Sequence, residues 1–207
     1  MFEYLFLIAS VAFILFLALL SPGPDFLMII KNSLQYSRRT GIFTAIGLGG
    51  GIAVHISYCL AGFAVIVSQS ILVFNILKFL GAAYLIYIGF QAFFAQLSDI
   101  NIENEKHKKD ISVMQALKIG FLTNVLNPKA TLFFMSLFSL FIPVDTPNVI
   151  LVILSILMIS MTIIWFILVA IFFTQPKVQK TFNKFQSDFN KLFGGLLIAL
   201  GVKIAVD

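Results

Sequence analysis

Apolar residues along this chain gather into long runs that short polar stretches separate. A bilayer core of about 30 Å requires roughly 20 apolar residues in helical form. Helices are expected because each backbone polar group in lipid needs a partner within its own segment, and no alternation of about ten residues, typical of a barrel strand, occurs. The pattern therefore predicts six transmembrane helices, near residues 4–30, 43–67, 71–95, 113–142, 148–173 and 189–206.

The composition places the chain in the membrane class. Hydrophobic residues make up 60% of the 207 residues and charged residues 11%, whereas a soluble domain has roughly 45–50% apolar and about 25% charged residues. We therefore expect an all-α integral membrane protein. The first run carries Glu3, and its first positive charge, Lys31, comes only after it, so we interpret this run as a retained span and not as a cleaved signal peptide.

Positive charges mark one side of the predicted membrane protein. Since six spans place alternate loops on the same side, the positive-inside rule predicts that the basic loops are cytoplasmic and that both termini are outside. The net charge of +5 then reflects topology, and we expect no nucleic acid as a partner. Of the 14 Lys and Arg residues, 11 fall in three alternate loops: Lys31, Arg38, Arg39, Lys106, Lys108, Lys109, Lys118, Lys177, Lys180, Lys184 and Lys191.

The longest polar stretch, 98–112, divides the chain into two halves of three spans each. We expect a first three-helix repeat over 1–97, a cytoplasmic linker over 98–112 and a second repeat over 113–207. Because each half has an odd number of spans, the second half crosses the membrane in the opposite sense. Two similar segments support the inverted repeat: "KFLGAAYLIYIG" in the third span of the first half and "KLFGGLLIALG" in that of the second.

Proline interrupts the first span of each half, within "SPGPD" and within "NVLNPKA". Pro22, Gly23 and Pro24 form the first break and Pro128 the second. A proline removes a backbone donor and blocks the preceding helical turn. Interrupted spans at corresponding places in two halves indicate a transporter's binding site, so we predict Pro-broken first helices that line a pathway. The alternative is a packing kink.

Ionisable and polar residues follow each break. Ionisable residues within spans are rare and functional by default. Asp25 is predicted to couple transport to protons or to bind a substrate ammonium, and its alternative is the N-cap of the next helix. Lys129 would attract a substrate carboxylate or pair with Asp25, and its alternative is snorkelling. Asn124 and Asn127 precede Pro128 and can hydrogen-bond exposed backbone or ligand.

His55 follows a stripe of small residues, Gly47 and Gly51, in the second span. Such a stripe indicates a close helix–helix contact, so His55 is expected to face protein. It would make an interhelical hydrogen bond or serve as a proton relay. "GLGGG" has no preceding strand and no following GK[ST], so it is not a phosphate loop. The single cysteine, Cys59, excludes an intramolecular disulfide or a CxxC pair.

The motifs together resemble the lysine exporter (LysE/RhtB) family of bacterial amino-acid efflux proteins over nearly the whole chain. The resemblance is carried by "SPGPDFLMI", "SRRTGIFTAIGLGGGIAVH", "LKFLGAAYLIYIGFQAF" and "GFLTNVLNPKATLFF". It implies a six-span exporter of amino acids or close metabolites in the inner membrane, driven by the membrane gradient through proton antiport. It also implies that Pro22, Gly23, Pro24, Asn127 and Pro128 belong to the paired breaks.

One acid and one base among the spans suit a zwitterion better than a dication, which favours a neutral amino acid as substrate. We expect a transporter and not an enzyme, without cofactor or metal site, whose partners are membrane lipid, the amino acid and H+. Homo-oligomer formation stays open. The rival functions are efflux of another small solute or a metal ion, which would want clustered carboxylate, His or Cys ligands, and a non-transporting assembly subunit.

Overall fold

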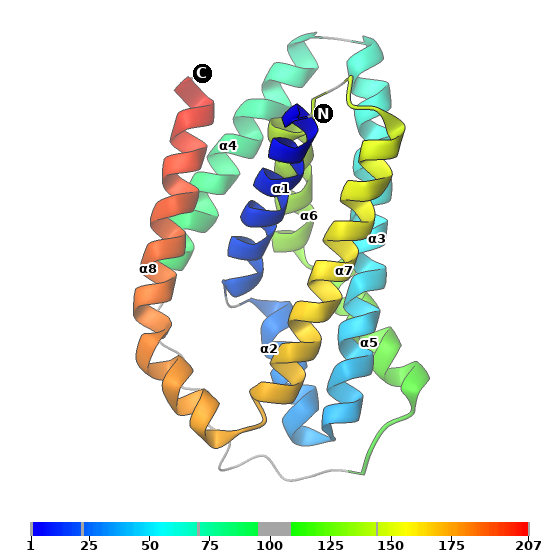
Figure 1. Ribbon diagram of the computed structural model, residues 1–207, viewed down its shortest axis with the longest axis vertical. Helices are drawn as coiled ribbons and strands as arrows, with labels where there is room; N and C mark the ends of the chain where they lie inside the picture. Colours follow the sequence, from blue (N-terminus) through cyan, green and yellow to red (C-terminus); the bar gives the residue numbers. More distant parts are fainter. Residues whose placement is uncertain (1, 22, 70, 95–108, 144, 207) are drawn as a thin grey trace.

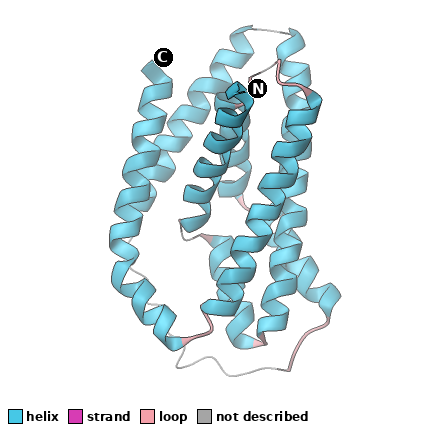
Figure 2. Cartoon of the chain, viewed as in Figure 1, coloured by secondary structure: helices cyan, strands magenta, loops and turns pink. Residues whose placement is uncertain are grey.

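The computed structural model describes residues 2–21, 23–69, 71–94, 109–143 and 145–206. Pro22 and residues 98–108 of the predicted linker lie outside these described residues. Within them the chain is helical and contains no strand (Figure 2), which confirms the all-α prediction. The helices are α1 Phe2–Leu20, α2 Pro24–Gln35, α3 Arg38–Gln69, α4 Ile71–Phe93, α5 Val113–Val125, α6 Pro128–Phe141, α7 Asn148–Phe172 and α8 Pro176–Val206 (Figure 1).

Two pairs of helices, α1 with α2 and α5 with α6, each follow one another end to end. In Figure 1, α1 and then α2 run from the end of the bundle that holds the N-terminus to the opposite end, and α5 and then α6 run the other way. Long helices surround these broken pairs: α3 packs against α5, α6 and α7, and α4 packs against α6 and α8. The two breaks therefore lie about midway along the bundle.

Three helical segments of the described residues are long and apolar enough to cross a bilayer: Glu3–Leu20, Arg38–Gly62 and Asn148–Phe172. Two further apolar segments are shorter, Phe79–Phe93 and Pro128–Phe141. Large apolar side chains such as Phe6 and Val149 are exposed on the outside of the bundle, as lipid contact requires. The fold is therefore that of an integral membrane protein.

Glycines set the distance between the most closely packed helices. A Cβ on Gly47 would collide with the backbone carbonyl of Leu117, and one on Gly51 would lie 2.5 Å from Asn124 Oδ1. Both contacts join α3 to α5, so the predicted small-residue contact is confirmed. The two similar segments also meet, since a Cβ on Gly89 of α4 would lie 2.8 Å from the carbonyl oxygen of Gly194 in α8.

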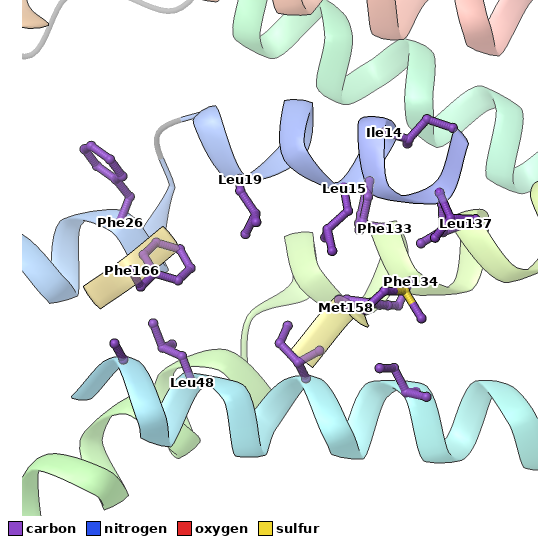
Figure 3. Packing of buried hydrophobic residues seen from close by; sticks show 14 of the residues in the cluster. Ile14, Leu15, Leu19, Phe26, Leu48, Phe133, Phe134, Leu137, Met158 and Phe166 are labelled. Atoms are coloured by element: carbon purple, nitrogen blue, oxygen red, sulfur yellow. The ribbon is translucent and has the colours of Figure 1, made fainter. Parts of the chain in front are cut away.

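A buried apolar cluster surrounds the first break. Figure 3 shows Leu15 and Leu19 of α1 and Phe133 of α6 on one side of the break, with Phe26 of α2 and Phe166 of α7 beyond it. Phe26 is 1% exposed and its ring meets that of Phe173 edge to face, with centroids 5.1 Å apart. Between helices in lipid such packing contributes van der Waals contact, not transfer out of water. Apolar packing thus encloses the polar residues of the breaks.

Candidate functional site

The first break separates the end of α1 at Leu20 from the start of α2 at Pro24. Proline fits the first position of a helix because its missing N–H has no partner there. Gly23 is the N-cap, with extended backbone and no side-chain cap. Asp25 is the second residue of α2, so the interpretation of Asp25 as the N-cap is wrong. Its Oδ2 instead accepts a hydrogen bond of 2.8 Å from Asn124 Nδ2.

The second break separates the end of α5 at Val125 from the start of α6 at Pro128. Asn127 is the N-cap of α6, and its side-chain oxygen accepts a hydrogen bond of 3.0 Å from the backbone N–H of Lys129. The prediction that Asn127 bonds exposed backbone is therefore confirmed. Both helices that follow a break begin with proline, and each carries its ionisable residue directly afterwards.

Lys129 reaches across from the second break to the first. Its Nζ donates hydrogen bonds to Ser21 Oγ at 2.9 Å and to the Ser21 carbonyl oxygen at 3.3 Å. Gly23 lies alongside, since a Cβ there would be 3.4 Å from Nζ. The ammonium thus faces the opposite break and does not snorkel toward the membrane surface.

A cavity of about 60 Å³ lies between the two breaks. Its apolar walls come from both broken pairs and from α3 and α7, and they include aromatic rings such as Phe26, Phe133 and Phe166. A small polar set within a largely apolar cavity is the usual composition of a small-molecule site. The polar lining residues are Ser21, Asp25, Asn124, Asn127, Lys129 and Thr162.

Two buried oxygens in this cavity lack a hydrogen-bond donor among the described residues: Asp25 Oδ1 and Asn124 Oδ1. The Asn124 carboxamide already donates through Nδ2 to Asp25, so its oxygen is left as an acceptor. A buried polar atom without a partner costs about 1–3 kcal/mol. Two such acceptors, one of them a carboxylate oxygen, suit a cation with several N–H donors.

His55 of α3 lies behind the cavity and contacts the second break. It is 1% exposed, and its Nε2 lies 3.0 Å from the backbone oxygen of Asn124. Its Nδ1 lies 2.6 Å from Tyr58 Oη. The predicted interhelical hydrogen bond is therefore confirmed, and the proton-relay role of His55 stays a prediction.

The predicted site residues come together with few exceptions. Gly23, Asp25, Asn124, Asn127 and Lys129 line one cavity. Pro24 and Pro128 start the helices that present them, His55 supports Asn124 from outside the cavity, and Pro22 lies outside the described residues. The described residues contain no group of three or more His, Cys, Asp or Glu side chains placed to hold a metal ion.

Three residues of the site were missed by the sequence analysis. Ser21 stands at the start of "SPGPD", and its place beside a proline break was the available signal. Tyr84 of α4 donates a hydrogen bond of 3.2 Å to the Lys129 carbonyl oxygen, and Thr162 of α7 lines the cavity. The latter two lie in other spans, and nothing in the local sequence marks them as parts of this site.

Comparison with known sequences adds independent information. The family model described as LysE type translocator matches residues 15–207. The chain is 34% identical over 131 residues to an uncharacterized membrane protein, YrhP, of Bacillus subtilis, a match that covers 58% of this chain and 60% of that protein. No solved structure matches the chain.

Two further relatives are both named leucine efflux protein. The one from Klebsiella pneumoniae is 30% identical over 156 residues, which cover 74% of this chain and 71% of that protein. The one from Salmonella typhimurium is 32% identical over 130 residues, which cover 62% of this chain and 60% of that protein. The match therefore spans about three fifths of the length of the Bacillus and Salmonella relatives.

Proposed function

Because the chain belongs to the LysE type translocator family, we propose that it exports a small zwitterionic amino acid from the cytoplasm in exchange for protons. The observation that carries this proposal is the cavity between the two helix breaks. Asp25 from one break and Lys129 from the other line it together, so a ligand in the cavity meets an acid and a base at once.

The ammonium group of the substrate would bind at the acidic side of the cavity. Asp25 Oδ1 and Asn124 Oδ1 are buried acceptors without a donor among the described residues, and an ammonium supplies three N–H donors. The carboxylate of the substrate would bind near Lys129 and the positive N-terminal end of α6, which begins at Pro128. This arrangement favours a zwitterion over a dication.

The side chain of the substrate would be apolar. The cavity walls are formed largely by residues such as Leu15, Leu19 and Phe133, and two relatives are named leucine efflux protein. We therefore propose leucine and amino acids of similar shape as substrates. Since ligand pockets usually measure roughly 300–1,000 Å³, the cavity of about 60 Å³ must widen when a substrate enters.

Asp25 also offers a simple basis for proton exchange. A carboxylate binds either a proton or an ammonium, so the two compete for the same oxygens. Release of the substrate outside would let Asp25 take up a proton, and release of the proton inside would free it for the next substrate. Proton antiport then follows from competition at one residue.

We further propose that the chain forms six spans as two inverted three-helix repeats in the bacterial inner membrane. The support is the opposite course of α1–α2 and α5–α6 along the bundle (Figure 1). The starts of α3, α5 and α8, where basic residues gather, lie at the end opposite both termini. With the positive-inside rule, this arrangement supports a cytoplasmic basic end and termini outside.

Counterflow in proteoliposomes tests the proposed function. Vesicles that contain the purified protein and unlabelled leucine should accumulate radiolabelled leucine, and an imposed pH gradient should drive leucine transport that a protonophore abolishes. Lysine should be exchanged far more slowly. Absence of exchange with any amino acid would overturn the proposal. Faster exchange of lysine than of leucine would overturn the zwitterion selectivity, and indifference to the pH gradient would overturn the proton coupling.

A growth assay separates the rival functions. Cells that carry the intact gene should tolerate an excess of leucine or leucine-containing dipeptides better than cells without it. Protection against metal salts instead would favour metal efflux. Equal growth under all conditions, together with no effect of substitutions at Asp25, would favour an assembly subunit.

A further inference from the structure

The carbonyl group of Asn124 stands where proline interrupts the helix. In a continuous α-helix it would accept the N–H of residue 128, but residue 128 is proline and has no N–H. The oxygen instead accepts the Asn127 N–H at 2.9 Å and lies 3.0 Å from His55 Nε2. Asn124 is 0% exposed, so bulk water does not reach it. His55 therefore adds a second donor to a carbonyl whose usual helical partner Pro128 removes.

The contacts of the imidazole define its protonation pattern. A backbone carbonyl oxygen only accepts hydrogen bonds, so the Nε2 that faces it carries the hydrogen. In the neutral ring Nδ1 is then the acceptor, and it receives the hydroxyl hydrogen of Tyr58 over 2.6 Å. The ring also stacks on Phe134, with centroids 5.8 Å apart and planes 4° apart. Position and tautomer of His55 are thus set by its neighbours.

Asn124 connects His55 to the cavity, because its backbone contacts His55 and its side chain contacts Asp25. His55 holds the backbone of Asn124, and the carboxamide of the same residue donates to Asp25 over 2.8 Å. Gly51, one turn before His55, leaves room for that carboxamide, since a Cβ at this position would lie 2.5 Å from Asn124 Oδ1. Because a carboxamide is not a group that readily takes up and releases protons, this chain of contacts transmits orientation rather than a proton.

We infer that His55 is a positioning residue, which adds a donor from α3 to the carbonyl that Pro128 leaves without its helical partner and thereby aims the Asn124 carboxamide at Asp25 and the cavity. Tyr58 assists by holding the imidazole in the Nε2–H tautomer. The effect on leucine binding rests on the proposed function, whereas the tautomer and the hydrogen bond belong to the protein alone.

The transport test compares two replacements of His55 in proteoliposomes. Glutamine can place an N–H close to the position of Nε2, and alanine cannot. His55→Ala should raise the KM for leucine about tenfold, the factor that corresponds to loss of one hydrogen bond of roughly 1.4 kcal/mol, with a smaller change in the maximal rate. His55→Gln should recover most of the affinity and keep the pH profile of the unchanged protein.

A matched control lies two residues away. Ser57→Ala removes a hydroxyl whose hydrogen bond among the described residues stays within α3, to the Ala53 carbonyl oxygen, and should leave the KM unchanged. A His55→Gln protein that binds leucine but no longer responds to a pH gradient would overturn the inference in favour of a proton relay. An unchanged KM in His55→Ala would also overturn it.

A spectroscopic test needs no transport. The chain has two histidines, His55 and His107, so His107→Ala leaves one to observe. In protein labelled with ¹⁵N-histidine, NMR should show the neutral Nε2–H tautomer of His55, and Tyr58→Phe should weaken that preference. An Nδ1–H tautomer would overturn the inference even if leucine export is confirmed. The expected tautomer in a protein that exports nothing would instead show that the proposed function alone is wrong.

Discussion

The break between α5 and α6 is fixed by its surroundings, whereas the break between α1 and α2 is fixed mainly by the other break. Asn127 caps α6 with its own side chain, His55 of α3 holds the Asn124 carbonyl and Tyr84 of α4 holds the Lys129 carbonyl. At the first break Gly23 provides no side-chain cap. Among the described residues, the side-chain hydrogen bonds that reach the first break from another helix come from Lys129 and Asn124.

This difference separates two tasks within one site. A transporter must keep binding groups in place and must also let one wall move. The second break presents its polar groups from a frame of contacts with α3 and α4. The first break meets the cavity through the extended backbone at Gly23 and through Asp25, whose main partner belongs to the other half. The comparison predicts two kinds of effect. At the first break, substitutions that remove a charge should reduce transport most. Around the second break, substitutions that disturb the packing should reduce transport most.

The largest effect is expected at the carboxylate of the first break. Asp25→Asn keeps the shape of the side chain but removes the charge that holds an ammonium or a proton. Loss of one member of a buried charged pair costs roughly 2–5 kcal/mol, so the initial rate of leucine export should fall on the order of 100-fold with folding largely intact. Counterflow rates and thermal unfolding of the same preparation measure both quantities.

The matched control for this change is Asp145→Asn, which alters an exposed carboxylate in the connection before α7. It should export leucine at the rate of the unchanged protein. Normal pH-driven transport by Asp25→Asn would remove Asp25 from the coupling mechanism.

A somewhat smaller effect is expected at the lysine of the second break. Lys129→Met retains a long apolar side chain but loses the donors that reach Ser21. We expect the KM for leucine to rise about 10- to 100-fold, since hydrogen bonds to charged groups contribute roughly 1.5–3 kcal/mol. Lys118→Met, at an exposed position of α5, serves as the control. An unchanged KM in Lys129→Met would assign the substrate carboxylate to another group.

The close packing of α3 against α5 beside the second break is tested by adding a methyl group between them. Gly51→Ala places a methyl group 2.5 Å from Asn124 Oδ1, so α3 and α5 must separate or the carboxamide must turn. Overpacking of this kind costs roughly 1–3 kcal/mol, and leucine export should fall by about tenfold. Gly62→Ala, where the added Cβ has no atom within 4 Å, should leave export unchanged and should not lower the melting temperature, because alanine within a helix is favoured over glycine. Equal leucine export by the two variants would show that transport does not depend on the close packing of α3 against α5.

The smallest effect is expected at the far end of α5, where Asp110 ties that helix to the start of α3. Its carboxylate accepts hydrogen bonds from Thr40 Oγ1 at 2.6 Å and from Ser37 Oγ at 2.7 and 2.8 Å. These bonds, led by that of Thr40 and assisted by the charge of Arg39, hold the pKa of Asp110 below its usual value of 3.8. Because Asp110 is exposed, solvent weakens the stabilisation.

The sign of the pH dependence follows from that lowered pKa. The carboxylate stabilises the fold above the unfolded value near 3.8, and the stabilisation disappears as the pH falls through the lower folded value. Asp110→Asn should therefore reduce the melting temperature slightly at pH 7, and the difference from the unchanged protein should vanish in strong acid. Thr40→Ala should have a similar effect, and a difference that grows on acidification would contradict this account.

The sequence by itself determined the class of the protein and the location of its breaks. Apolar runs of bilayer length require helices because lipid offers no hydrogen-bond partners to the backbone, and Pro24 and Pro128 interrupt the preceding helical turn because each lacks a backbone N–H. Gly47 and Gly51 marked a close contact because only a small residue allows backbones to approach. Local rules of this kind need no knowledge of the partner helix.

The tertiary structure alone decided how the parts of the site meet. Asp25 and Asn124 are 99 residues apart and share a hydrogen bond, while Lys129 turns toward Ser21 although its sequence also allowed snorkelling. Tyr84 and Thr162 joined the site without any local signal, and Asp25 bonded to the other half instead of capping its own helix. Such choices depend on which helices become neighbours, because a side chain in a span pairs with whatever polar group the packing brings within about 3 Å.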